Sequence, residues 1–208
     1  MSNYKLAPWG YMVDSAQNIT DLLSVEEFLN FTNKKYNGND TRIVPNIASA
    51  SASVRNYCGW HVAPALNCSM NYNVRDLRDA FVGGDLLIQL PATFVTSVSK
   101  VTIDGEEIEA NRVDLSPSGL VRIFDTGVLD KRSRILIEFT SGFDEVPAIK
   151  EIVANGVMHA LANTYGVASE AAGGVSVSYS ANWSGKGSTA LADEARETLE
   201  AYKVKGVY

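Results

Sequence analysis

The chain has 208 residues, 46% of them hydrophobic, which suits one domain or one domain with a sizeable insertion. Its formal net charge of −6 disfavours a protein that grips DNA, because phosphate binding depends on Lys and Arg. Cys58 and Cys68 are too few for a disulfide framework, and the sequence shows neither a secretion signal nor eighteen consecutive apolar residues. We therefore expect a protein without a membrane partner, made in a reducing cytoplasm.

Two helices are predicted near the start of the chain. Residues 1–20 show no clear period, and we expect an arm that only a neighbouring molecule orders. Ser24 and Glu27 have the spacing of a capping box and begin a short helix. A second helix is predicted over 42–58, where apolar residues recur every three or four positions. Ala and Ser alternate within it over 48–53, and such small side chains allow a close helix contact.

The period then changes to two, which predicts five or six antiparallel strands between residues 61 and 140. The predicted strands cover 85–90, 94–103, 107–114, 120–124 and 134–140. Asp104-Gly105 is a strong signal for a two-residue hairpin turn.

Helical period returns at Pro147 and continues to about Tyr165. This helix is apolar nearly all round, which is equally typical of a central core helix and of a helix shared between subunits. A short strand is predicted over 175–179 and a Gly/Ser hinge over 182–187. The last helix begins near Ser188 and has a narrow apolar stripe opposite acidic residues.

These elements predict an α+β fold. It is a helical bundle of about four helices with an inserted antiparallel β domain and a C-terminal docking helix. The predicted boundaries are an N-terminal arm at 1–20, a helical core at 21–60 and 146–166, an inserted β domain at 61–145, and a short strand, hinge and C-terminal helix at 167–208.

Side chains that could support catalysis are few. His61 and His159 lie among apolar neighbours, which favours structural roles. Cys58, His61 and Cys68 are close in sequence, but their spacing matches no standard zinc pattern, and small apolar core residues are the simpler interpretation of the cysteines. Lys186 is followed by Gly187, so the phosphate-loop pattern fails. We predict no catalytic residue, no metal ligand, no cofactor and no enzyme activity.

The ordered set of elements carries a resemblance to a known family. Its parts are a capped helix starting at 23–28, a small-residue helix ending at 54–59, a strand and turn over 95–105, and a strand at 135–143 leading into Val146-Pro147. This order is similar to the head–tail connector, or adaptor, family of long-tailed double-stranded DNA bacteriophages and gene transfer agents. The resemblance covers about residues 21–166. Members often carry a Trp in the loop that here spans 127–131, where this chain has none.

The resemblance implies a non-enzymatic virion protein at the head–tail interface, assembled in the host cytoplasm. Copies would form a homo-oligomeric ring, usually dodecameric, docked on the portal protein. The ring would extend the DNA channel, which DNA crosses without specific binding, and would offer its other face to a stopper or tail-completion protein. The acidic balance agrees with such a conduit.

Two groups of residues are candidate interfaces. The C-terminal helix follows a hinge and has a narrow apolar stripe, which favours docking into a groove of a partner over packing on its own bundle. The expected portal or partner contacts are Trp183, Leu191, Ala195, Leu199 and Tyr202. The expected subunit contacts are Ala48, Ser51, Val157 and Met158.

Three other functions are weighed against the adaptor. A stopper or tail-terminator is expected to be mostly β, which the two long helices disfavour. A ligand-binding β module would need exposed aromatic clusters, whereas Phe81, Phe94 and Phe124 fit core positions. A hydrolase lacks a nucleophile, base and orienting group in one place.

Overall fold

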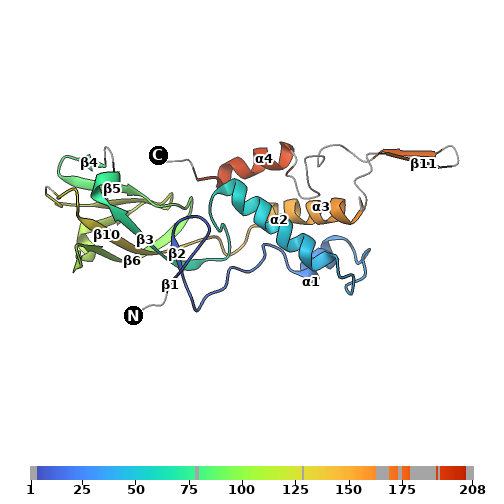
Figure 1. The fold of residues 1–208 in the computed structure, drawn as a ribbon, viewed down its shortest axis with the longest axis horizontal. Helices are drawn as coiled ribbons and strands as arrows, with labels where there is room; N and C mark the ends of the chain where they lie inside the picture. Colours follow the sequence, from blue (N-terminus) through green and yellow to red (C-terminus); the bar gives the residue numbers. More distant parts are fainter. Residues whose placement is uncertain are drawn as a thin grey trace. The chain divides into compact units, whose positions relative to one another are not determined.

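The chain folds into two compact units, and the computed structural model describes residues 4–77, 80–127, 129–162, 169–172, 175–178, 191 and 193–204. The β unit comprises Met1–Ile19, Gly59–Glu145 and Val204–Tyr208, and the helical unit comprises Thr20–Cys58 and Val146–Lys203. Figure 1 shows the two sheets of the first unit and the helices of the second. The fold is mixed α+β, as the sequence predicts.

Four α-helices are described in the helical unit: α1 (Val25–Phe31), α2 (Ile43–Cys58), α3 (Pro147–Ala162) and α4 (Asp193–Leu199). The capping box is confirmed, because Ser24 Oγ accepts from the Glu27 N–H at 3.2 Å and the Glu27 carboxylate accepts from the Ser24 N–H at 2.8 Å. Positions 163–165 of the predicted third helix and the expected cap at Ser188 lie outside the described residues. Within the described part of the chain, no helix has the length and apolar character needed to cross a bilayer.

The core of the helical unit lies where α2 packs against α3. The fully buried branched side chains of these two helices are Ile43, Ile47, Val54, Ile149, Val153 and Val157. Each such side chain stabilises the fold by roughly 1.5–3 kcal/mol relative to leaving it exposed. Ala50 and Ala154 are also buried, and short side chains at a helix contact let the two backbones approach closely.

Two antiparallel sheets form the β unit. The larger sheet has the order β1 (Tyr4–Leu6), β2 (Met12–Asp14), β3 (Leu66–Asn73), β10 (Arg134–Ser141), β6 (Val95–Ile103), β7 (Glu106–Glu107). The smaller has the order β4 (Phe81–Val82), β5 (Asp85–Gln89), β9 (Leu120–Ile123), β8 (Val113–Leu115). Burial alternates along β10, where Ile135, Ile137 and Phe139 face the core, so the predicted period of two is confirmed there.

The predicted hairpin turn at Asp104-Gly105 joins β6 to β7, and Ile103 pairs with Glu106 across it. Asp104 has φ 51° and Gly105 has φ 90°, the two left-handed conformations that a two-residue turn of this kind requires. The predicted strand at 107–114, by contrast, is divided. Ile108 still bonds to Val101, but a 3₁₀ turn at Ala110–Arg112 then carries the chain to the smaller sheet.

The N-terminal segment differs from the expected arm. β1 pairs with β2, and β2 pairs with β3 through Val13 and Cys68, so residues 4–14 are ordered by their own chain. Tyr11 and Val13 are buried. No periodic pattern marks β1 or β2, because strands of three residues are too short to display a period.

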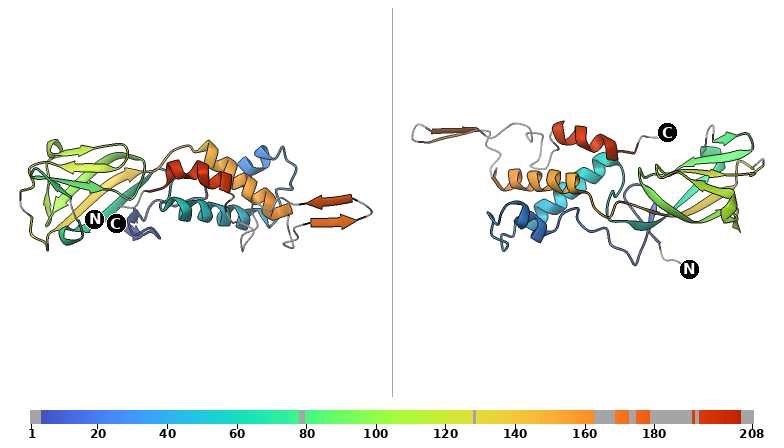
Figure 2. Two further views of the ribbon diagram at one scale, coloured as in Figure 1. Left: turned by 90° about the horizontal axis from the view of Figure 1, so that it is seen from above. Right: turned by 180° about the vertical axis from the view of Figure 1, so that it is seen from behind.

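A further hairpin is present near the end of the chain. β11 (Ser169–Ala172) pairs with β12 (Val175–Ser178), and Figure 2 shows the two strands side by side. β12 confirms most of the strand predicted over 175–179, whereas β11 was not predicted, because Ser-Glu-Ala-Ala has low strand propensity.

Candidate partner-binding site

Helix α4 was expected to dock on a partner, and the structure places it against α2 and α3 of its own chain. Leu199 has no accessible surface and Ala195 is buried, so these two side chains belong to the core of the helical unit. Leu191 and Tyr202 are half-buried, and Trp183 lies outside the described residues. The expectation of a partner contact is therefore corrected for Leu199, since a side chain without accessible surface offers none to a neighbour. Ala195 also lines a groove between α3 and α4, so its expected partner contact stays a prediction.

A surface cluster fastens the end of α4 to α2. The Tyr57 hydroxyl donates a hydrogen bond to the Glu200 carboxylate, and Lys203 Nζ donates to the same carboxylate at 3.1 Å. Lys203 also lies over the Tyr57 ring, 4.8 Å from its centroid. The bond to Glu200 raises the pKa of the Tyr57 hydroxyl. Because the cluster is solvated, it orients the helix end more than it stabilises the fold.

The four expected subunit contacts divide into two kinds. Ser51 and Val157 are fully buried, and Ser51 Oγ accepts a hydrogen bond from the Leu22 N–H at 3.0 Å. These two are corrected to core positions, because their own unit already encloses them. Ala48 is exposed and Met158 is half-buried, so both keep surface for a contact.

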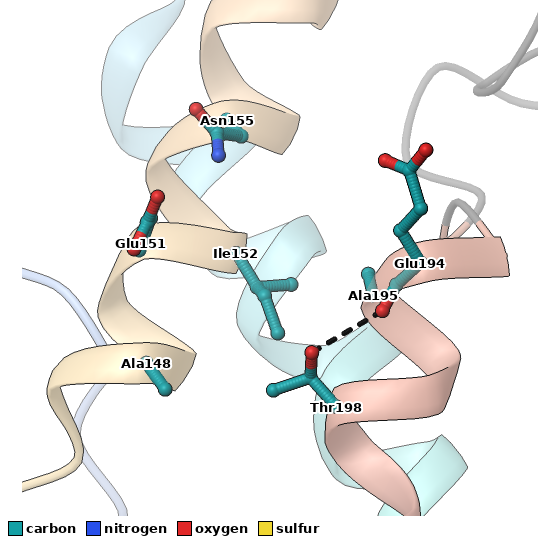
Figure 3. Close-up of a pocket in the computed structure, with 7 residues that line it drawn as sticks. All are labelled: Ala148, Glu151, Ile152, Asn155, Glu194, Ala195 and Thr198. Carbon is teal, nitrogen blue, oxygen red and sulfur yellow. Dashed lines mark hydrogen bonds between the residues drawn. The ribbon is translucent and has the colours of Figure 1, made fainter.

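A groove runs between α3 and α4 and encloses about 280 Å³. Figure 3 shows Ile152 pointing from α3 toward α4 and Thr198 pointing back toward α3, with Glu151 and Glu194 at the edges. Ile152 is buried and forms the apolar floor together with Ala195. In the part of the chain that the structure describes, neither Glu151 nor Glu194 forms an ion pair. The groove suits an apolar side chain accompanied by a cation.

His61 has a structural role in the β unit. Its Nε2 lies 3.0 Å from the Ser141 carbonyl oxygen, which can only accept, so Nε2 carries the hydrogen. Nδ1 then accepts from the Tyr11 hydroxyl at 2.6 Å, and that hydroxyl accepts from the His61 N–H at 3.0 Å. Both ring nitrogens are thus used, and the ring is fully buried. His159, on α3, is half-buried.

The two cysteines are buried, as small apolar core residues would be. Burial raises the pKa of the Cys58 thiol to about 12 and that of the Cys68 thiol to about 11. Neither is a thiolate near neutral pH, and the thiolate is the form that binds zinc or attacks substrates. The described residues contain no group of three His, Cys, Asp or Glu side chains placed to hold a metal ion.

The aromatic residues of the β unit are less buried than expected. Phe81 is 40% exposed on the edge strand β4, which corrects its predicted core position. Phe94 is half-buried and stacks on Phe143 at 4.5 Å between ring centroids. Phe124 is half-buried under the Arg122 guanidinium, 4.8 Å from the ring centroid. The three rings come from separate elements and form no shared binding surface in the contacts described here.

The chain therefore has an α+β fold in which the described polar side chains cap helices, close turns and bind one another. The model of the head completion protein family matches residues 21–204. The chain belongs to this family of structural virion proteins, which confirms the resemblance drawn from the order of its elements.

Solved structures agree with this fold. The chain is similar to one in the virion of a native gene transfer agent particle, with 18% identity, a TM-score of 0.50 and coverage of 100% of this chain and 97% of that chain. The same values describe its similarity to a chain in the neck of an empty particle, computed with C6 symmetry. A search of curated proteins returned no match.

Proposed function

We propose that this chain is a head–tail adaptor of a virus particle. Its copies form a closed ring that docks on the portal, extends the DNA channel and provides the attachment site for stopper or tail proteins. The match of the head completion family to residues 21–204 is the observation that carries the proposal. The likeness in fold to a chain from a gene transfer agent neck supports the same place in the particle.

The charge of the chain supports a passive conduit. A net charge of −6 repels phosphate groups, so DNA can pass the ring without being retained. A protein that held DNA in place would instead need clustered Lys and Arg.

We assign different contacts in the particle to the helical unit and to the β unit. We assign the half-buried residues Leu191 and Tyr202, at the two ends of α4, to the portal side. We assign the loops of the β unit, which is inserted between the two parts of the helical unit, to the tail side or the outside of the ring. Ala48 and Met158 are the expected subunit contacts that keep accessible surface.

Particles made without this chain test the proposal. We expect heads that package DNA but lose it and that acquire no tails, and we expect purified wild-type protein to restore both properties. The Val157→Asp variant, whose fold should be severely destabilised, is the negative control. Particles that keep their genome and acquire tails in the absence of the chain would contradict the proposal.

Electron microscopy of the restored particles separates an adaptor from a stopper. An adaptor is expected in direct contact with the portal, whereas a stopper would lie beyond it on the tail side. Density for this chain only on the tail side would exclude the adaptor role while leaving the family assignment intact.

A further inference from the structure

The loop that joins α1 to α2 is flanked by exposed apolar side chains and carries free positive charge. Phe31 is 44% exposed at the end of α1, and Val44 is 58% exposed at the start of α2. Lys34 and Lys35 are exposed between them, and neither forms an ion pair with any described residue. We call these four residues the basic patch.

Arg42, in the same loop, differs from the two lysines because its charge is paired with a carboxylate. Its guanidinium donates two hydrogen bonds to the Asp40 carboxylate, at 3.0 and 2.7 Å. The two lysines have no such partner within the described chain. Lys35 lies over the Tyr36 ring, 6.0 Å from its centroid, but has no carboxylate partner among the described residues. Exposed apolar side chains close in sequence to ammonium groups without a carboxylate partner are typical of a surface that a partner covers.

The groove between α3 and α4 has the complementary character. Its floor is apolar, and its edges carry Glu151 and Glu194, whose carboxylates have no cationic partner among the described side chains. At about 280 Å³ it is smaller than the clefts of roughly 300–1,000 Å³ that hold drug-sized ligands. The acidic edges also exclude nucleic acid, so a protein side chain with a cation nearby is the chemistry that fits.

Helix α1, from whose end the basic patch begins, and the groove lie on different sides of α3. Lys150 faces α1, since its Nζ lies 2.7 Å from Glu27 Oε1, whereas Ala148, Ile152 and Asn155 face the groove. At roughly 100° per residue, Lys150 is roughly 150° round the helix from the centre of the groove. Figure 1 likewise shows α4 and α1 on different sides of α3. One copy therefore presents both surfaces at once.

We propose that the groove of one copy receives the basic patch of the next copy, with Lys34 and Lys35 facing Glu151 and Glu194 and an apolar side chain above Ile152. This inference rests on the proposed function and names the subunit contact of the ring. Because the two surfaces differ, the contact is heterologous, which is the type that generates closed rings.

Charge reversal with rescue tests the contact on the full chain. The Lys34→Glu/Lys35→Glu variant and the Glu151→Lys/Glu194→Lys variant should each weaken self-association by at least about tenfold, because like charges then face each other. The four substitutions combined should restore most of it. Matched controls on the β unit are Lys131→Glu/Arg132→Glu and Glu106→Lys/Glu109→Lys, which make the same charge changes on exposed side chains away from the contact.

Sedimentation equilibrium at low ionic strength is the measurement, since salt screens such pairs. Reversed variants that associate as strongly as wild type, or a combined variant that recovers nothing, would overturn the contact. If the wild-type chain stays monomeric in solution, the same variants are compared by their incorporation into particles, and equal incorporation overturns the contact. Wild-type protein absent from the particle neck would refute the proposed function instead, whatever the variants do.

Discussion

The β unit and the helical unit are stabilised by different kinds of buried contact. The β unit buries the polar side chain of His61, and both of its ring nitrogens form hydrogen bonds, one with Tyr11 and one with Ser141. The helical unit is closed mainly by apolar contacts, and its last helix adds one fully buried Leu199 and a solvated cluster around Glu200. Buried polar contacts demand one geometry, whereas apolar contacts tolerate small shifts. We infer that the helical unit, and α4 in particular, adapts more readily to a neighbour.

The backbone near His61 shows how tightly the geometry around its hydrogen bonds is fixed. Gly142 has φ 115°, and a Cβ at this position would lie 2.3 Å from the Pro64 carbonyl oxygen and 2.8 Å from His61 Nε2. Val62 has φ 66°, a left-handed conformation that is strained for a β-branched residue. The surrounding contacts hold it there, including a 2.8 Å hydrogen bond from the Phe143 N–H to its carbonyl oxygen.

The largest effect is expected from a charge in the apolar helical core. Val157→Asp places a carboxylate at a position with no accessible surface, which should destabilise the chain by more than about 4 kcal/mol. Urea unfolding followed by circular dichroism measures this. The matched control Val44→Asp, on an exposed first turn, should change stability by less than about 0.5 kcal/mol. A stable Val157→Asp variant would show that this face of α3 is not core.

The next effect tests the tight closure of the β unit. Gly142→Ala should cost about 3 kcal/mol, because the new Cβ meets backbone that cannot move aside and the left-handed φ is retained. Gly83→Ala is the control, since φ is 63° there but the space is open, and about 1 kcal/mol is expected. Thermal unfolding compares the two variants. Equal losses would mean that the contact with Pro64 relaxes easily.

A smaller loss is expected for the last helix. Leu199→Ala should cost about 2 kcal/mol, at the low end for a buried Leu, because a short terminal helix can shift to fill the space. Hydrogen exchange should show α4 opening more often while α3 keeps its protection. Uniform loss of protection in both helices would contradict the view that α4 is the adaptable element.

The smallest effect is a dependence on pH at α1. The hydrogen bond from Lys150, followed by that from the Ser24 N–H, lowers the pKa of the Glu27 carboxyl from 4.5 to about 2. A lowered carboxyl pKa stabilises the fold above about pH 4.5, and this contribution is lost as the pH falls toward 2. The side chain is 43% exposed, so solvent screening keeps the effect small.

Urea unfolding of wild type and Glu27→Gln measures this contribution. Wild type should be the more stable at pH 7, and the difference should shrink by pH 3. A difference that stays constant across this range would show that the ion pair with Lys150 contributes nothing to folding.

Much of the fold followed from local sequence signals. Ser24 and Glu27 marked the start of α1, and Asp104-Gly105 marked a hairpin, because caps and turns depend on a few adjacent residues. Strand β3 was not separately predicted, since its burial does not alternate cleanly. The short strands β1 and β2 were missed for lack of length.

The candidate site was harder to predict than the fold. An amphipathic stripe such as Leu191–Leu199 looks the same whether it packs on its own chain or on a partner, and only the structure showed which side chains its own unit encloses. Glu151 and Glu194 come from helices distant in sequence, so no spacing could have joined them into one groove.

The bond between His61 and Ser141 also bears on how the chain reaches its final form. These residues stand 80 positions apart, near the two ends of the segment Gly59–Glu145 of the β unit. Joining the ends of a free segment of that length costs about 4 kcal/mol of chain entropy. Once the strands have assembled, this cost is already met, so the separated halves of the helical unit meet at high effective concentration. The folded segment Gly59–Glu145 thus holds the end of α2 near the start of α3, so these two helices can pack without closing a long free loop.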